Sequence, residues 1–419
     1  MNLEARDAVK PVSRMSPILF VFFISAFFSV FGFKLFSVID TMALVPLLAV
    51  FFLTLIGFRL RIPFHIFTLN LGVFYSLVLM FYLFNAEGNL IDIHPTIRLF
   101  RGLISGVAIY LISFFVASRR EISIEKIFNI VCLVFLICAF AIYLQVVVPS
   151  TQPLFSEIWG FNKGVKPLRA FGLSAGYDTS GYLLSWFAGV LLCAAILTKK
   201  ARYAAFLMIV FPSILFTSRT SMVLVLCLLA LALLTNSGRR AIFSPRIFVL
   251  FSIFIAAGVM YVGPIVLGSV FNMEMSTIVL GVEVSSRFAT SNIATVLDQH
   301  YFMPDSPWSI FFGAGSFPKA DPGYTNVINH SGLLSLPLYS SFYIITFLIA
   351  TGAYKQNKIH APDAFSRLWV RILYFSIASL VLVMFISNFK NLYFYTRGFH
   401  EAVLLMLGVF TGFLQRLRR

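Results

Sequence analysis

The segment KIFNIVCLVFLICAFAIYLQVVV, residues 126–148, decides the fold class of this 419-residue chain. After Lys126 it contains no charged side chain, and it is long enough to cross roughly 30 Å of bilayer hydrocarbon as an α-helix. Similar apolar runs recur from end to end, so that 59% of the residues are hydrophobic and only 11% are charged. Backbone groups in lipid must be hydrogen-bonded within their own helix. The sequence therefore predicts an all-α, polytopic membrane protein with a single integral membrane domain over residues 1–419.

About twelve transmembrane helices account for these apolar runs, with ends that we place to within about three residues. They cover residues 16–36, 40–58, 63–84, 98–117, 126–148, 178–198, 203–217, 219–236, 246–268, 331–353, 368–388 and 398–414. Two connections, at about 149–177 and 269–330, are much longer than the others. Long loops in compact proteins tend to be functional, so we expect the chemistry of this protein to involve the 269–330 loop.

The distribution of positive charge gives the predicted orientation. With the N-terminus in the cytoplasm, most of the 32 Lys and Arg residues fall in cytoplasmic loops, as the positive-inside rule requires. Both termini are then cytoplasmic, and the two enlarged loops lie on the outer face. The net charge of +16 follows from this topology, and it does not indicate binding to nucleic acid.

The sequence contains no pattern typical of a cofactor or metal site. Its four cysteines all fall within predicted spans, where we expect them to pack as small apolar side chains: Cys132, Cys138, Cys193 and Cys227. A CxxC pair, a Walker loop and a dinucleotide fingerprint are all missing from the sequence. We therefore expect no cofactor, and ATP-driven transport by this chain alone is disfavoured.

The cations on the predicted outer face need a separate explanation, because the sidedness rule does not favour them there. Lys34, Arg98 and Arg101 lie at predicted helix ends, where we expect them to reach lipid headgroups. Arg98 and Arg101 also share a helix face, so an anion site at these two residues stays an alternative.

The remaining outer cations gather in three segments, and they include Arg169, Arg219, Arg287, Lys390 and Arg397. Arginine is suited to bidentate recognition of phosphate and stays charged when partly desolvated. Arginines that converge from separate outer loops would form a pyrophosphate clamp at the membrane surface. Alternatively, each arginine pairs with a lipid phosphate or with a carboxylate such as Glu157, Glu283 or Asp298.

Four short motifs on the outer side carry a resemblance to a known family. They are Arg169-Ala170-Phe171-Gly172-Leu173; Ser218-Arg219-Thr220; Gly313-Ala314-Gly315 followed by Asp321-Pro322-Gly323-Tyr324 and Gly332-Leu333; and Asn388-Phe389-Lys390 with Thr396-Arg397-Gly398. In their order and sidedness, along nearly the whole chain, these motifs resemble the Wzy-type O-antigen and capsular polysaccharide polymerases. These enzymes belong to one superfamily with the O-antigen ligases.

The resemblance implies a GT-C-like fold and glycosyl transfer on the periplasmic face of a bacterial inner membrane. Donor and acceptor would be undecaprenyl-diphosphate-linked oligosaccharides: an acceptor hydroxyl attacks the anomeric carbon and the lipid diphosphate leaves, with no metal. Arg219 and Arg287 would bind the donor diphosphate, supported by Arg169, Lys390 and Arg397. Membrane lipid is a further expected partner. Binding of a chain-length regulator protein stays an open possibility.

The acceptor hydroxyl needs a residue that orients or deprotonates it. Asp321 lies eleven residues before Gly332, at the spacing that the ligases' histidine has to a Gly-Leu pair, and polymerases commonly have aspartate there. Asp321 is the preferred base and His330 the second candidate. Each has an alternative role: Asp321 could simply accept backbone N–H bonds in an Asp-Pro-Gly turn, and His330 could lie at a helix N-terminus at the membrane interface. Glu401 is a third candidate, or a partner of Arg397.

Aromatic residues of the long loop could stack on sugar rings or pack against the membrane: Tyr301, Phe302, Trp308 and Tyr324. One feature departs from the family, because arginine-plus-glycine loop repeats do not follow Arg169 or Arg287. Two rival functions stay open, namely an O-antigen ligase that uses lipid A-core as acceptor, and a flippase or transporter of lipid-linked oligosaccharides. A transporter predicts ionisable residues at mid-membrane depth.

Overall fold

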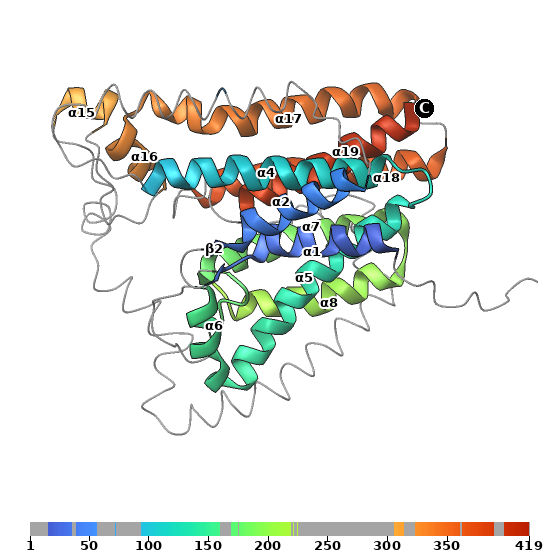
Figure 1. Ribbon diagram of the computed structural model, residues 1–419, viewed down its shortest axis with the longest axis horizontal. Helices are drawn as coiled ribbons and strands as arrows, with labels where there is room; N and C mark the ends of the chain where they lie inside the picture. The colour runs from blue at the N-terminus through green and yellow to red at the C-terminus, as the bar shows by residue number, and fades with distance from the viewer. Residues whose placement is uncertain are drawn as a thin grey trace, which may run out of the picture.

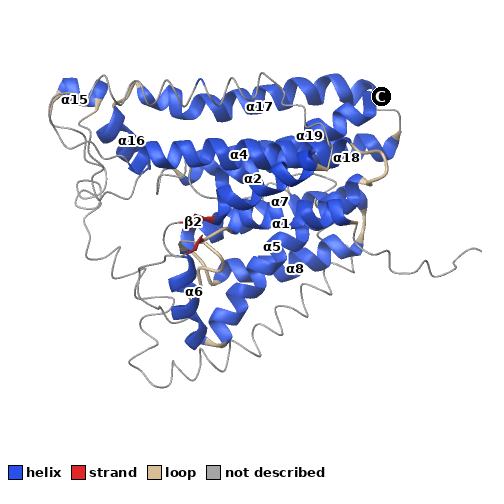
Figure 2. Ribbon diagram, in the orientation of Figure 1, coloured by secondary structure: helices blue, strands red, loops and turns tan. Residues whose placement is uncertain are grey.

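The computed structural model describes residues 16–35, 39–56, 72, 94–159, 169–174, 176–218, 221, 224, 306–313, 323–360, 363–388 and 398–418. Within these ranges almost all regular structure is helical, as Figure 2 shows. The exception is a pair of antiparallel strands of two residues each, β1 (Lys34–Leu35) and β2 (Ile39–Asp40). The predicted all-α class is therefore confirmed.

Nine helices of fifteen or more residues in the described ranges overlap predicted spans (Figure 1), although some ends differ by more than three residues, for example that of α17. They are α1 (Pro17–Phe31), α2 (Thr41–Leu55), α4 (His94–Ser118), α5 (Ile124–Val147), α7 (Tyr177–Thr198), α8 (Ala201–Leu215), α17 (Ser335–His360), α18 (Ala364–Ser387) and α19 (Phe399–Arg418). The predicted spans at 63–84, 219–236 and 246–268 lie outside the described residues, apart from isolated positions.

Five of the described helices contain segments long and apolar enough to cross a membrane: Phe100–Ser118, Ile124–Val147, Tyr177–Thr198, Ser335–Asn357 and Ala364–Ser387. Large apolar side chains also cover the outside of the bundle, for example Phe51, Phe140 and Leu348. Such surfaces are typical of contact with lipid. The class of helical membrane protein is supported, whereas the count of twelve spans and their sidedness stay predictions.

The two enlarged loops contain short helices of their own. In the 149–177 segment, the 3₁₀ turn Pro149–Thr151 leads into α6 (Gln152–Trp159), whose Trp159 indole N–H donates to the Phe31 carbonyl at 2.8 Å. In the 269–330 segment, α15 (Pro307–Phe312) and α16 (Gly323–Ser331) precede α17. These helices, together with β2, lie along the left side of Figure 1. We call this side of the bundle the motif end.

The helix α19 occupies the centre of the bundle, with nearly every residue from Phe399 to Leu414 buried. It packs closely along α4 because glycines let the two backbones approach, as in small-xxx-small membrane helix pairs. A methyl group at Gly408 would lie 2.6 Å from the Tyr110 carbonyl oxygen, and one at Gly412 would lie 2.4 Å from that of Phe114. Neither distance can be accommodated without moving a helix.

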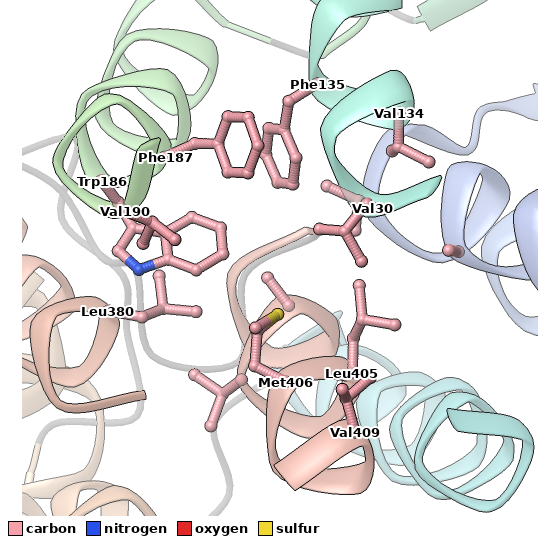
Figure 3. Close-up of a cluster of buried hydrophobic side chains, with 14 of the residues drawn as sticks. Val30, Val134, Phe135, Trp186, Phe187, Val190, Leu380, Leu405, Met406 and Val409 are labelled. Carbon is pink, nitrogen blue, oxygen red and sulfur yellow. The ribbon is translucent and has the colours of Figure 1, made fainter. Parts of the chain in front are cut away.

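Apolar side chains of α1, α5, α7 and α18 meet those of α19, as Figure 3 shows. Phe135 of α5 stacks on Phe187 of α7 with 4.3 Å between ring centroids, and it meets Trp186 edge-on. The Trp186 indole N–H donates to the Ser376 carbonyl of α18 at 2.8 Å, which fixes α7 against α18. Of the predicted buried cysteines, Cys132 and Cys138 are buried and Cys193 is partly buried, whereas Cys227 lies outside the described residues.

The glycine contacts of α19 lead to a stability prediction. Gly412→Val should lower the free energy of unfolding by about 1–3 kcal/mol, because it forces α4 and α19 apart. The measurement is the melting temperature of the detergent-solubilised protein. Gly352→Val is the matched control, since no atom lies within 4 Å of a methyl group there and the change in helix propensity is the same. Equal melting of the two variants would contradict the proposed α4–α19 contact.

Candidate functional site

Three of the predicted site residues belong to the described part of the chain: Arg169, Tyr324 and His330. The other five, Asp321, Arg219, Arg287, Lys390 and Arg397, lie outside the described residues. The structure does describe residues within two positions of Asp321, Arg219, Lys390 and Arg397, but none near Arg287. The described neighbours show which parts of the bundle lie close to one another.

The Arg169 segment contacts the segment that precedes Arg219. The Ala170 N–H donates to the carbonyl of Phe216 at 2.8 Å. Beyond this bond, Thr217 and Ser221 pack on α7, where a methyl group at Gly181 would lie 2.6 Å and 2.2 Å from their hydroxyl oxygens. Two motifs that are distant in sequence are thus neighbours at the motif end.

A buried glutamine fixes the backbone after Arg169. The side-chain oxygen of Gln145 in α5 accepts from the N–H groups of Phe171 and Gly172, both at 3.1 Å, and its nitrogen donates to the Gly172 carbonyl at 2.7 Å. Gly172 has a φ of +61°, a conformation that glycine adopts without strain. The Gly172 of the predicted motif is thus required by the backbone turn.

The Arg169 side chain itself is partly exposed. Its guanidinium lies 5.9 Å from the centroid of the Tyr177 ring, within cation–π range. Its backbone carbonyl accepts from the Gln152 side chain at 3.0 Å. Arg169 is therefore held by its backbone and one aromatic ring, and its charge can still reach an anionic ligand.

The segment around α16 is compact because two glycines allow close backbone contacts. A methyl group at Gly313 would lie 2.4 Å from the His330 carbonyl oxygen, and one at Gly332 would lie 2.1 Å from that of Phe311. Both glycines have positive φ, +89° and +78°. The Gly313 and Gly332 motifs thus join α15 to the α16–α17 connection.

His330 lies in the last turn of α16 and is only 1% exposed. Its Nδ1 forms a hydrogen bond of 2.5 Å with the Ser331 hydroxyl. The alternative that placed His330 at a helix N-terminus at the interface is wrong, because α16 is a separate short helix that ends before Gly332. Enclosure of His330 limits its access to an acceptor hydroxyl.

Tyr324 attaches the Asp321-Pro322-Gly323-Tyr324 segment to the end of α18. Its N–H donates to the Asn388 carbonyl at 3.3 Å, and its hydroxyl donates to the Phe385 carbonyl at 2.9 Å. Burial raises the pKa of the Tyr324 phenol, so the hydroxyl stays protonated and can donate at neutral pH. The Asp321 segment and the Asn388-Phe389-Lys390 segment are thus neighbours, like the Arg169 and Arg219 segments.

An apolar groove of about 500 Å³ opens beside Tyr324. It lies between the first turns of α17 and the end of α18, and its lining consists of Tyr324, Leu336, Pro337, Ser340, Ser341, Ile344, Ile345 and Phe385. Trp308, another predicted stacking residue, is 65% exposed, and its ring centroid lies 4.2 Å from that of Phe312 in α15. Tyr301 and Phe302 lie outside the described residues.

A buried polar cluster joins α4, α17 and α19, and of its members the sequence had singled out Glu401, as a third candidate base or a partner of Arg397, but not His400. Glu401 accepts from the Ser105 hydroxyl at 2.7 Å and from the Gly398 N–H at 2.9 Å. His400 meets the Tyr343 hydroxyl through Nδ1 at 3.1 Å. Glu401 and His400 are at most 1% exposed. The adjacent His400 and Glu401 after Gly398 were the available signal, since charged residues inside a membrane span seldom lack a role.

Arg101 belongs to the same cluster, and its predicted contact with lipid headgroups is wrong. Its Nε lies 3.6 Å from the Asp40 carboxylate, and the two side chains are only 15% and 19% exposed. The reason is that α4 begins at His94, four residues before the predicted span, which places Arg101 about two turns inside the helix. The Asp40 carboxylate offsets part of the Arg101 charge.

Contacts with α1 and α7 hold the turn at Gly398, which also lies at the motif end. Gly398 has a φ of +84°, and a methyl group there would lie 2.7 Å from the Val30 carbonyl oxygen and 3.1 Å from a Leu183 methyl. Leu183 lies on α7, two residues after Gly181. The first two turns of α7 therefore contact both the Ser218 segment and the Thr396-Arg397-Gly398 turn.

The described part of the chain brings no three His, Cys, Asp or Glu side chains together as metal ligands. Absence of a metal at the site stays a prediction, because Asp321 and most of the long loop lie outside the described residues. What the described geometry offers is a set of motif segments gathered at one end of a membrane bundle. Comparison of the sequence with models of known protein families gives no match, and neither does comparison with curated proteins.

The contacts of Gln145 lead to a prediction about the Arg169 segment. Gln145→Leu should leave two buried N–H groups and one carbonyl without their partner, at a cost of about 1–3 kcal/mol for each group that water does not reach. The melting temperature should fall, and trypsin should cleave faster after Arg169. The exposed Gln356→Leu variant is the control. Unchanged cleavage in Gln145→Leu would show that Gln145 does not hold this segment.

Proposed function

We propose that this protein is an inner-membrane glycosyltransferase of the polymerase type, which joins undecaprenyl-diphosphate-linked repeat units at the motif end. The observation that carries the proposal is the meeting of the motif segments. The Ala170–Phe216 hydrogen bond joins the Arg169 and Arg219 segments, and the Tyr324–Asn388 hydrogen bond joins the Asp321 and Lys390 segments. Both contacts occur at the same end of the bundle.

The juxtaposition of the Arg169 and Arg219 segments suits recognition of a diphosphate. Arginines on two segments fixed to each other can act on one ligand, and preorganised cations stabilise the charge that develops on a leaving diphosphate. In this proposal Arg219 and Arg287 bind the donor diphosphate, and Arg169, Lys390 and Arg397 support them.

Asp321 is the better candidate for the residue that orients or deprotonates the acceptor hydroxyl. It lies three residues before Tyr324, whose backbone and hydroxyl are fixed to α18. His330 is enclosed and already hydrogen-bonded to Ser331. A general base must come within hydrogen-bond reach of the proton that it removes, and the burial of His330 disfavours it for this role.

The apolar groove beside Tyr324 supports a lipid-linked substrate. Its volume of about 500 Å³ and its mostly apolar lining suit a segment of an isoprenoid chain. A chain that lies in this groove would bring its diphosphate towards the Asp321 segment. The groove could thus hold the lipid part of such a substrate while its diphosphate and glycan lie at the motif end.

The transporter alternative has one observation in its favour, namely the cluster of the buried His400 and Glu401 with the partly buried Asp40 and Arg101. However, His400 and Glu401 lie in the first turn of α19, and Asp40 is the N-cap of α2. The cluster is therefore near the ends of these helices, whereas transport sites lie near the middle of the bilayer. This position favours a role in holding the helices together.

The proposal predicts the products of a strain that lacks its own copy of the gene. The wild-type protein should restore a ladder of polysaccharide lengths at the cell surface, and Asp321→Asn and Arg287→Ala should leave single repeat units. Loss of a general base or of a charge-stabilising residue should slow the reaction by about 100-fold or more. The measurement is gel electrophoresis of the surface polysaccharide at matched protein levels.

Arg120→Ala is the matched control, because this exposed arginine lies at the opposite end of the bundle, and its ladder should be unchanged. A full ladder in both Asp321→Asn and Arg287→Ala would contradict the site assignment. If deletion of the gene also removes the single capped unit, the protein is a ligase. If single units accumulate on the inner leaflet, it is a transporter.

A further inference from the structure

A second cavity lies at the opposite end of the bundle from the motif end, between α7 and α18. Its volume is about 250 Å³, and its lining consists of Leu197, Ala364, Arg367, Leu368 and Arg371. Leu197 belongs to the last turn of α7, and the other four belong to the first two turns of α18. Ser366, Trp369 and Val370 point into the bundle, so the cavity lies on the outer side of α18.

Two arginines supply all the charge of this cavity. Arg367 and Arg371 are four residues apart, which places them one above the other on one helix face. Neither takes part in the ion pairs found between described residues, which involve Asp40 and Glu125. The cavity therefore carries two positive charges that no described carboxylate neutralises.

Two described carboxylates, Asp363 just before the arginines and Glu125 on α5, have partners of their own. The Asp363 carboxylate caps its own helix, accepting from the Ser366 N–H at 2.5 Å and from the Ser366 hydroxyl at 3.2 Å. Glu125 pairs with Lys200, which precedes α8, and with Arg202 in the first turn of α8. These contacts leave the two arginines of α18 available for an anion from outside the protein.

The remaining lining residues fit an amphiphile better than a free ion. Leu197 and Leu368 supply aliphatic surface directly beside the guanidinium groups. Further along α18, the outward side chains are apolar, including Leu382, which is 53% exposed. A ligand with a phosphate at Arg367 and Arg371 could therefore lay an acyl chain along this face. Basic pockets between membrane helices are typical sites for acidic lipid headgroups.

We propose that the Arg367–Arg371 cavity binds the phosphate headgroup of an anionic phospholipid. The bidentate geometry of arginine suits the headgroup phosphodiester. The site lies at the far end of α7 and α18 from the motif segments and does not depend on the proposed glycosyltransferase activity. A bound lipid would fasten α7 to α18 at this end, as the Trp186–Ser376 hydrogen bond does in the middle.

Native mass spectrometry of the full-length protein in detergent tests this site. The protein is titrated with phosphatidylglycerol and, separately, with phosphatidylcholine. Phosphatidylglycerol should bind more tightly, and Arg367→Gln/Arg371→Gln should weaken its binding by about tenfold or more, since each basic residue near a membrane surface contributes to anionic lipid binding. The affinity for phosphatidylcholine should differ less than about twofold between the wild type and Arg367→Gln/Arg371→Gln.

Arg120→Gln/Lys355→Gln is the matched control, because it removes two exposed cations at the same end of the bundle. An equal loss in both double variants would overturn the proposal, because it would indicate a general effect of surface charge. Unchanged binding in Arg367→Gln/Arg371→Gln would overturn it as well. Displacement of the lipid by inorganic phosphate at equal concentration would also contradict it, since the acyl chain would then contribute nothing. Melting temperatures measured without added lipid should be equal in all variants.

Discussion

The close approach of α4 and α19 is the constraint on which the rest of the structure depends. Gly408 and Gly412 allow backbone contact along the middle of the pair. Hydrogen bonds hold the pair at both ends. Ser105 of α4 donates to Glu401 at one end, and Arg416 of α19 donates to the Arg119 and Ile122 carbonyls, just after α4, at the other. In lipid the hydrophobic effect does not drive helices together, so packing and interhelical hydrogen bonds must do so.

This helix pair also sets the arrangement of the motif end. Glu401 holds the N–H of Gly398, and Gly398 in turn packs on α1 and on the first turns of α7. The same turns of α7 receive Thr217 and Ser221, next to the Arg169 segment. The buried polar groups of α19 therefore help to hold in place the segments that we propose to bind the substrate.

The apolar runs located the described helices to within a few residues, because each run must be about as long as the bilayer is thick. It could also identify Gly172, Gly313 and Gly332, whose motifs reflect backbone turns with positive φ. It placed Arg101 and His330 wrongly, because both errors depended on where a helix begins or ends, and hydropathy defines such boundaries poorly. The contacts of Gln145 could not be predicted, since they join segments whose proximity exists only in the folded chain.

The central claim is that the gathered motif segments catalyse glycosyl transfer between lipid-linked units. The most direct test uses the purified protein in proteoliposomes supplied with undecaprenyl-diphosphate-linked repeat units, in the presence of a metal chelator. Glycan length and released lipid diphosphate are measured together. The account predicts longer glycans, with one lipid diphosphate released for each new linkage. Repeat units that cross the bilayer or stay single, with no diphosphate released, would contradict it.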